Sequence, residues 1–213
     1  MCILWQNRLT RSGPVHDPTL ETLVADQQIT PELANYISSA RVALALADVN
    51  DDHRLVMVNT AFCDLTGYGS DEVVGQNCRF LQVSRSRGKS ENVDALTDIR
   101  RFLSEPDVQT VRTPIVNFTK DDKPFVNLLF MSKLKGPSGT TRYIFASQFD
   151  VSRSHLSMLD SYDLQLSQAI SGLSPVLQES GMIIEGSLAT IANSAAMIAQ
   201  AKMILSQLEA SNS

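Results

Sequence analysis

Long apolar runs are absent from this sequence of 213 residues. No stretch approaches the roughly 18 consecutive apolar residues that a helix needs to cross a bilayer, so we expect no membrane span. The apolar stretch within residues 1–8 is also too short for the core of a signal peptide.

Cysteine is scarce as well. The three cysteines, Cys2, Cys63 and Cys78, form an odd set without paired spacing. That pattern favours neither a disulfide framework nor a zinc site. The histidines are scattered and lack the spacing of metal ligands. We therefore expect a protein of a reducing compartment, the cytoplasm, without a bound metal.

Positive charge is too sparse for a nucleic-acid surface. The chain has 18 Lys and Arg against 23 Asp and Glu, a net charge of −5. A protein that binds nucleic acid needs basic side chains to neutralise phosphates, so we expect no such partner. What remains is an ordinary globular composition, with 43% apolar and 19% charged residues.

The distribution of turn and helix signals divides the chain into three parts. The expected parts are an N-terminal extension (1–41), a core (42–151) and a C-terminal helical extension for dimerisation or signalling (152–213). Short helices are predicted at about 18–27 and 31–40, because a capping residue precedes a proline at the start of each.

The core has two strands, then helices, then three strands. The expected strands are 42–49, 54–58, 110–119, 124–134 and 141–151, and the expected helices are 60–66, 71–82 and 91–105. Ser70 is expected to cap the helix at 71–82, and residues 84–90 are expected to form a basic loop. Polar turn clusters between strands indicate hairpins and therefore antiparallel pairing. This order predicts an α+β fold, a five-stranded antiparallel sheet with helices on one face.

Two amphipathic helices are predicted in the C-terminal extension. Apolar residues recur at alternating steps of three and four in two runs, 156–177 and 184–205, with breaks expected near Pro175 and Gly181. The pair cannot form a core alone, so it is expected to pack on the core domain, on another copy, or on both.

Each of these apolar runs is interrupted by one charged residue. Asp163 lies in the first run and Lys202 in the second. An isolated charge in a packing seam either fixes the register of the helices or points to solvent, and the sequence leaves both interpretations open.

The segment around Cys78 is unusually polar for a buried cysteine. A free cysteine is most often a small core residue, which is also how we interpret Cys63. Here Asn77, Arg79 and Gln82 surround the thiol. The Arg79 cation favours a thiolate or an anionic ligand group, and the amides suit a polar, planar ligand.

At this segment the chain resembles a LOV domain, the blue-light-sensing branch of the PAS superfamily. Residues 77–82, NCRFLQ, match the signature of that family at all six positions. Further similarity covers residues 59–68, the two asparagine-bearing strands at 116–120 and 125–130, and the glutamine-bearing strand at 147–150. The similarity spans about half of the chain, and the ordered Asn, Asn and Gln make it specific.

The resemblance implies a flavin held between the helices and the inner face of the sheet. Cys78 would be the photoreactive thiol, which bonds to ring carbon C4a after blue light and is released in the dark. Asn117 and Asn127 would hydrogen-bond the pyrimidine edge, whose alternating donors and acceptors suit a side-chain amide. Gln148 would lie near ring N5 and rotate its amide when N5 gains a proton.

The remaining implied contacts concern the flavin tail. Asn77 and Gln82 would complete the polar contacts, and Arg79 would bind the ribityl phosphate. A second phosphate-binding arginine of the family is replaced here by Gly88 or, with the longer loop removed, Val93. Three loop residues, Arg85, Arg87 and Lys89, either substitute for it or are solvated charges. FMN is the expected cofactor, with FAD and riboflavin as alternatives.

The layout resembles that of bacterial short LOV proteins, which have helical extensions and no fused effector. The C-terminal extension has two basic and five acidic residues, which argues against a DNA-binding helix-turn-helix. We expect a photoreceptor that is not an enzyme and signals through rearranged terminal helices or a changed oligomeric state. A homodimer through those helices is expected, with a possible downstream protein partner. The alternative is a light-independent flavin redox or small-molecule PAS sensor.

Overall fold

The computed structural model describes residues 29–50, 52–90, 92–152, 156–184, 199–200, 202–204 and 206. The fold presented below is the compact unit that begins at Pro31. The helix expected at 18–27 lies outside the described residues.

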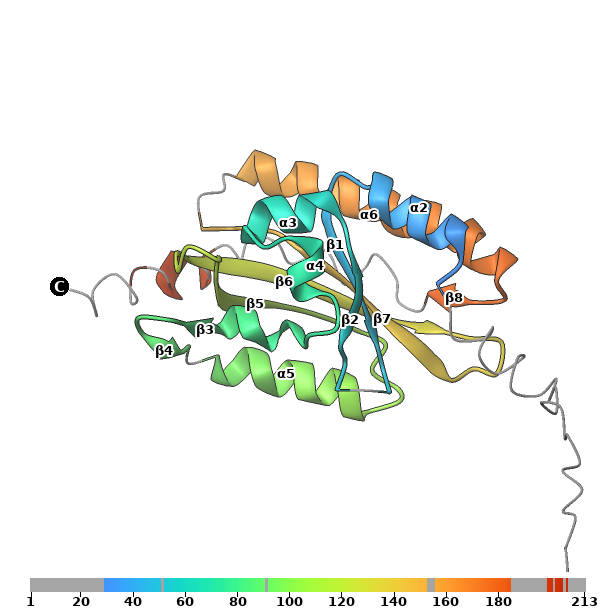
Figure 1. Cartoon of the computed structure of the whole chain (residues 1–213), viewed down its shortest axis with the longest axis horizontal. Coiled ribbons are helices and arrows are strands. Elements are labelled where there is room, and N and C mark those ends of the chain that lie inside the picture. Colours follow the sequence, from blue (N-terminus) through green and yellow to red (C-terminus); the bar gives the residue numbers. More distant parts are fainter. Residues whose placement is uncertain are drawn as a thin grey trace, which may run out of the picture. The chain divides into compact units, whose positions relative to one another are not determined.

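An antiparallel sheet forms the centre of this unit (Figure 1). Its main strands are β1 (Ala43–Asp48), β2 (Leu55–Val58), β5 (Thr110–Phe118), β6 (Pro124–Lys135) and β7 (Thr141–Gln148). They lie in the order β2-β1-β7-β6-β5, and β8 (Ile183–Ile184) adds a short sixth strand beside the end of β6. The five expected strands and the α+β class are thereby confirmed.

One face of the sheet is covered by the segments between β2 and β5. These are α3 (Thr60–Thr66), α4 (Ser70–Val73), the 3-10 helix η1 (Cys78–Gln82), the hairpin of β3 (Val83–Ser84) and β4 (Gly88–Lys89), and α5 (Val93–Ser104). Side chains alternate between the faces of a strand, so every second residue of β5, β6 and β7 points toward these helices.

Asn59 fixes the entry of this helical layer. Its side-chain oxygen caps α3 by accepting from the Phe62 amide (3.0 Å) and also accepts from the Leu44 amide (2.9 Å). Its side-chain nitrogen donates to carbonyl oxygens of the segment before β1, including that of Val42 at 2.8 Å. A single buried amide therefore joins β1, α3 and the segment that follows α2.

The opposite face of the sheet is covered by α6 (Leu156–Glu179), alongside which α2 (Pro31–Ser39) lies (Figure 1). The apolar run of α6 points inward, and Leu159, Leu166 and Leu173 are fully buried. The Tyr36 hydroxyl of α2 donates to the Ala169 carbonyl at 2.8 Å. Gly172 permits this approach, because a Cβ at that position would overlap the Tyr36 ring and hydroxyl. The first C-terminal helix thus packs on the core of its own chain.

Two predictions for the segment before the cysteine were wrong. The helix expected at 71–82 is interrupted, because α4 ends at Val73 and η1 begins only at Cys78. Gly75 between them has φ +85°, a left-handed conformation that ends a helix and that glycine adopts readily. Ser70 is not the cap, since Gly69 holds that position and its amide donates to the Glu72 carboxylate. The expected loop at 84–90 contains the β3–β4 hairpin.

The C-terminal extension also differs from the sequence expectation. The helix does not break at Pro175, which lies inside α6, and the chain turns only at Gly181 (φ +65°). Asp163 does not point to solvent but forms an ion pair with Arg112 of β5. Ile184, expected to begin the second helix, lies in β8. Most of that second run is outside the described residues. Across the described ranges, none of the helices combines the length and apolar character needed to cross a membrane.

Candidate functional site

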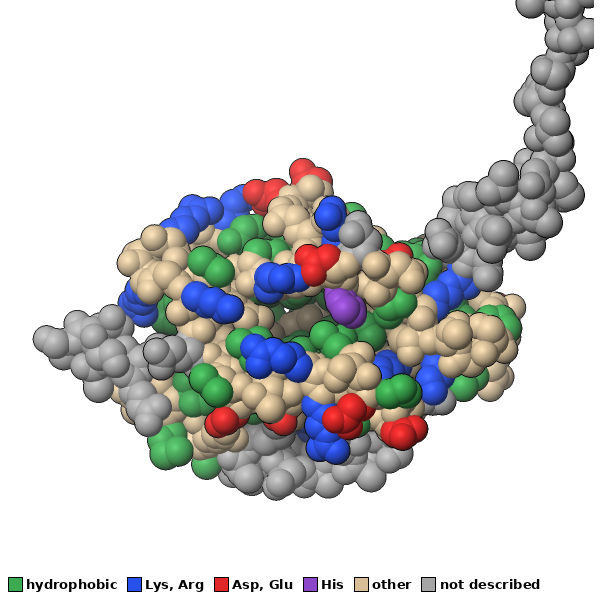
Figure 2. Space-filling view, turned by 90° about the horizontal axis from the view of Figure 1, so that it is seen from below, with side chains coloured by type: hydrophobic (Ala, Val, Ile, Leu, Met, Phe, Trp, Pro, Cys, Tyr) green, Lys and Arg blue, Asp and Glu red, His purple; other side chains and the backbone are tan. Residues whose placement is uncertain are grey.

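A cavity lies between the sheet and the helices of the layer that contains η1 and α5. Its volume is about 130 Å³, and it opens to solvent at a mouth. Figure 2 shows a hollow in one face of the molecule, bordered by basic, acidic and histidine side chains. Its apolar wall consists of Ala45, Ala47, Leu55, Ile99, Leu103, Ile115, Leu129, Met131, Ile144 and Ala146.

The polar side chains of the cavity come from three regions of the fold: the segment 77–82, the strands β5 to β7, and the turn between β1 and β2. The seven residues that the sequence analysis singled out here are Asn77, Cys78, Arg79, Gln82, Asn117, Asn127 and Gln148, and all of them line it. The strand residues among them share a face because they alternate with residues that point the other way. His53, from the turn between β1 and β2, lines the cavity as well and was not predicted.

Cys78 begins η1 at the cavity wall. The Asn77 side chain positions it, since its oxygen accepts from the Arg79 amide at 3.0 Å and so caps the 3-10 helix. Burial raises the pKa of the Cys78 thiol to about 12, because a thiolate is poorly solvated there. Cys78 is therefore a protonated thiol at neutral pH, and of the two alternatives for the Arg79 cation, a thiolate or an anionic ligand group, the raised pKa favours the second.

Three buried amides lie on neighbouring strands across the cavity. Asn117, Asn127 and Gln148 are each at most 3% exposed. The Asn127 side-chain nitrogen donates to the Asn117 side-chain oxygen at 2.9 Å, and the Asn127 oxygen accepts from the Phe149 amide at 3.2 Å. Within the described part of the chain, Gln148 Oε1 is buried and accepts no hydrogen bond. Because such an atom is costly to bury unpaired, it indicates that a polar ligand completes the hydrogen bonding of this amide.

Arg79 lies at the mouth of the cavity and has an acidic partner. Its guanidinium forms an ion pair with the Asp52 carboxylate, and both side chains are more than half exposed. The Asn77 side-chain amide donates to the Asp52 carbonyl, so the turn before β2 is held against the residues that flank Cys78. Asp52 and His53 both have left-handed backbone conformations, with φ of 54° and 51°.

The structure does not bring the basic hairpin residues to the cavity. Arg85, Arg87 and Lys89 are exposed, and none is among the residues that line it. The hairpin is instead held by Asp122, whose carboxylate accepts from the amides of Arg85 (2.8 Å) and Ser86 (3.1 Å). The hydrogen bond from the Ser86 hydroxyl contributes most to lowering the pKa of Asp122, to about 2.

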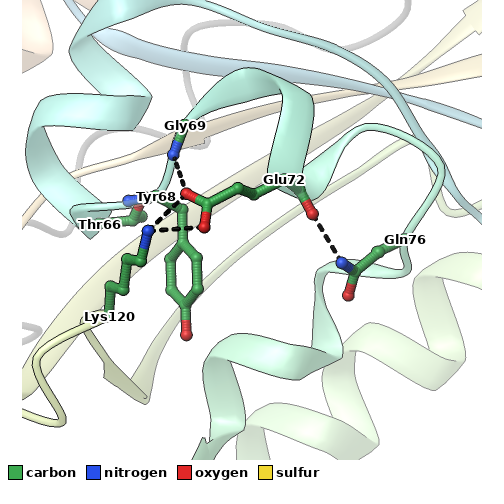
Figure 3. A network of polar contacts seen from close by, with 6 residues as sticks. All are labelled: Thr66, Tyr68, Gly69, Glu72, Gln76 and Lys120. Atoms are coloured by element: carbon green, nitrogen blue, oxygen red, sulfur yellow. Dashed lines mark hydrogen bonds and ion pairs between the residues drawn. The ribbon is translucent and has the colours of Figure 1, made fainter.

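A polar network positions the chain that leads to Cys78 (Figure 3). The Glu72 carboxylate accepts from the Gly69 amide at 2.8 Å and from the Lys120 ammonium at 2.6 Å. The Gln76 side chain donates to the Glu72 carbonyl at 2.6 Å. The hydrogen bond from Lys120 is the main cause of the lowered pKa of Glu72. The network thus joins α4 to the β5–β6 turn. It also restrains residues 72–76, the segment that precedes Asn77, at both of its ends.

On the far side of β7, α6 contacts the residues that flank Gln148. The hydroxyls of Ser147 and Tyr162 share a buried hydrogen bond of 3.0 Å. The Phe149 and Tyr162 rings stack with centroids 4.3 Å apart. Burial raises the pKa of Tyr162 to about 12, so it remains a neutral hydrogen-bonding group. One side chain of α6 therefore contacts both neighbours of the cavity glutamine.

Comparison with known proteins assigns the fold to a class. A family model for the PAS domain matches residues 41–153, and this chain belongs to that family. A solved LOV protein of Rhodobacter sphaeroides is similar over 84% of this chain and 95% of its own, with a TM-score of 0.61 and 26% identity.

Two curated relatives are also similar to this chain over about half of its length. Blue-light-activated histidine kinase 1 of Erythrobacter litoralis is 35% identical over 112 residues, which are 52% of this chain and 29% of that protein. Blue light receptor lreA of Aspergillus flavus is 35% identical over 114 residues, 51% of this chain and 13% of that protein. The chain spans less than a third of the length of these relatives. The resemblance of the core to LOV domains is thereby confirmed.

Two features at the mouth of the site were missed by the sequence analysis. Asp52 and His53 follow a run of polar residues that predicts only a turn. Nothing in the sequence indicates that this turn meets the residues beside Cys78, 25 positions along the chain in the case of Asn77. Cys63 lies outside the cavity lining and packs against the core cluster around Phe62, as expected.

Proposed function

We propose that this chain is a blue-light sensor that holds FMN in the cavity and uses Cys78 as its reactive thiol. The carrying observation is that Cys78 and the three buried amides line one cavity, where Gln148 Oε1 has no partner among the described residues. A bound flavin would supply light absorption and a ring carbon, C4a, to which the Cys78 sulfur bonds reversibly.

The amide pair suits the pyrimidine edge of a flavin. Asn117 and Asn127 are fixed by their mutual hydrogen bond and by backbone contacts. A side-chain amide has two donor hydrogens and two acceptor lone pairs, so both residues retain hydrogen-bonding capacity toward the cavity. Fixed, buried amides orient a planar ligand without the entropy cost of ordering loose side chains.

Cys78 is suited to a reaction that needs both a sulfur and a proton. Because its pKa is about 12, the thiol keeps its proton at neutral pH. Cys78 would give that proton to ring N5 as its sulfur bonds to C4a, and would take it back when the bond breaks in the dark. Asn77 holds the start of η1 and thereby the direction of the Cys78 side chain.

Gln148 would connect this chemistry to the helices. If N5 changed from acceptor to donor, the Gln148 amide could rotate and present its oxygen in place of its nitrogen, without any change of net charge. Its neighbours Ser147 and Phe149 contact Tyr162 of α6. A shift of β7 would therefore alter the packing of α6, which is a packing switch of the kind that local ligand chemistry can bias.

The output that we propose is a rearrangement of the terminal helices or a change of oligomeric state, without enzymatic activity. A homodimer through these helices is supported by exposed apolar side chains on α6, Met158 and Leu164. A downstream protein is the other partner that such a surface fits. Size-exclusion chromatography with light scattering, in the dark and under blue light, tests this. A monomer in both states contradicts the dimer.

The test of the sensor itself is made on protein purified in the dark. Its pigment is released and identified as FMN, FAD or riboflavin, and the visible spectrum is recorded before and after a blue flash. We expect a flavin band that bleaches and recovers, and a Cys78→Ala variant that keeps the flavin but does not bleach. A bound flavin that does not respond to light in the unmodified chain would contradict the proposal and favour a redox or small-molecule sensor.

A further inference from the structure

We propose that Asp52 sets the specificity of the cavity for the flavin tail, by competing with a phosphate for Arg79. The consequence is a site that accepts riboflavin almost as well as FMN. This inference rests on the proposed function, since it concerns which flavin the same cavity prefers.

The contact between Asp52 and Arg79 is the basis of this inference. Arg79 lines the cavity, and its guanidinium is already engaged by the Asp52 carboxylate. The Asn77 side chain holds the Asp52 carbonyl, so the acidic side chain is tethered beside the residues that begin η1. A phosphate that approached Arg79 would have to displace this carboxylate or remain close to it.

Few basic side chains at the mouth of the cavity are available to bind a phosphate in place of Arg79. Among the residues that line the cavity, Arg79 is the one arginine or lysine, and His53 is the other basic side chain. Arg85, Arg87 and Lys89 lie on the exposed hairpin and do not join them. The Asp52 carboxylate therefore neutralises the cation on which phosphate recognition depends.

Coulomb's law gives the size of the effect. Two like unit charges about 4 Å apart in bulk water weaken binding roughly fivefold. A phosphate monoester carries about −1.5 to −2 charges at neutral pH. Removing the Asp52 charge is therefore expected to strengthen FMN binding roughly tenfold, whereas riboflavin, whose tail is neutral, should be almost unaffected. Added salt should diminish the gain, because these charges are exposed.

The experiment compares two ligands on one full-length chain. Flavin-free protein is titrated separately with FMN and riboflavin, and the ratio of their dissociation constants is determined from flavin fluorescence. Asp52→Asn keeps the backbone carbonyl that Asn77 contacts, so the turn should persist. We expect this variant to raise the preference for FMN roughly tenfold. Asp64→Asn is the matched control, because Asp64 is an exposed acid of α3, and it should leave the ratio unchanged.

A second pair of variants separates competition from a change of shape. Arg79→Gln leaves the Asp52 carboxylate without its counter-charge, so it should lower the FMN preference roughly tenfold in the original chain. Arg79→Gln combined with Asp52→Asn removes both charges and should restore the original ratio to within about twofold. If Asp52→Asn and Asp52→Ala both bind the two flavins with the original ratio, the inference is overturned. That result leaves the sensor intact if the flavin still bleaches and recovers. Failure to bind either flavin would instead contradict the proposed function.

Discussion

The ion pair between Arg112 and Asp163 joins the sheet to α6 where both partners are shielded from solvent. The Arg112 side chain is 2% exposed and that of Asp163 is 17% exposed. Arg112 lies on β5, on the face opposite the cavity residue Asn117, and Asp163 follows Tyr162 on α6. Replacing Asp163 with Ala would leave the Arg112 guanidinium buried without this carboxylate.

The magnitude follows from the burial of the remaining charge. Removing one partner of a buried ion pair typically costs about 3–5 kcal/mol. Since Asp163 retains some exposure, we expect the lower end of that range, about 3 kcal/mol. For a chain of this size the loss corresponds to a fall in Tm of roughly 6–12 °C. Replacing both partners by apolar residues, Arg112→Met with Asp163→Leu, should recover most of the stability, because no charge is then left buried.

Equilibrium unfolding in urea, followed by circular dichroism, measures these free energies. Asp160→Ala is the matched control, because Asp160 is an exposed residue of the same helix, and it should change the free energy of unfolding by less than about 0.5 kcal/mol. The reasoning is refuted if Asp163→Ala costs no more than Asp160→Ala. The reasoning is refuted equally if the double variant loses as much free energy of unfolding as Arg112→Met and Asp163→Leu lose together as single variants. The pair would then have no coupling energy.

Three further predictions concern stability and reactivity. Asn59→Ala removes a buried amide that joins three segments, and it should lower the free energy of unfolding in urea by about 3 kcal/mol; a loss below 1 kcal/mol would show that the segments hold without it. Gly172→Ala forces a methyl group against Tyr36, which should lower the free energy of unfolding by about 1–3 kcal/mol in the same assay. The double variant Gly172→Ala/Tyr36→Phe should still be less stable than the original chain, because the aromatic ring remains in contact with the added methyl group. In flavin-free protein, the rate at which iodoacetamide modifies Cys78 should rise about tenfold per pH unit beyond pH 9, because burial favours the neutral thiol and raises its pKa to about 12; a plateau near pH 9 in the folded protein would contradict that shift.

The strand residues of the site could be predicted because sheet geometry is regular. Asn117, Asn127 and Gln148 each lie at an even spacing from apolar residues that line the same wall, such as Ile115, Leu129 and Ala146. A period of two places them on one face whatever the precise twist of the sheet. The local signature around Cys78 identified the remaining members by resemblance.

Features that depend on a single backbone conformation or on distant partners could not be predicted. Gly75 interrupts an otherwise helical pattern, because its positive φ ends the helix, and the sequence does not indicate that conformation. Pro175 lies inside α6 between two fully buried residues, Leu173 and Leu177, so the helix is packed on both sides of the proline. Asp163 is paired with a residue 51 positions away, which no local pattern indicates.

The role of Arg79 shows the same limit at the site itself. Its neighbours in sequence indicate a cation beside a thiol, which suggests an effect on the Cys78 pKa. In the structure the guanidinium contacts Asp52, and burial governs the thiol. The sequence left two roles open for the Arg79 cation, a thiolate or an anionic ligand group beside it, and the raised pKa of Cys78 favours the second.

The most direct test of the proposed chemistry is a light-minus-dark infrared difference spectrum in the region of the S–H stretch. Because Cys78 is a protonated thiol that would lose its proton as sulfur bonds to the flavin, illumination should remove one S–H band, and the band should return in the dark. The loss should be absent in Cys78→Ala and unchanged in Cys63→Ala. An S–H signal that persists under blue light while the flavin bleaches, or one lost in Cys63→Ala alone, would contradict the assignment of Cys78 as the reactive thiol.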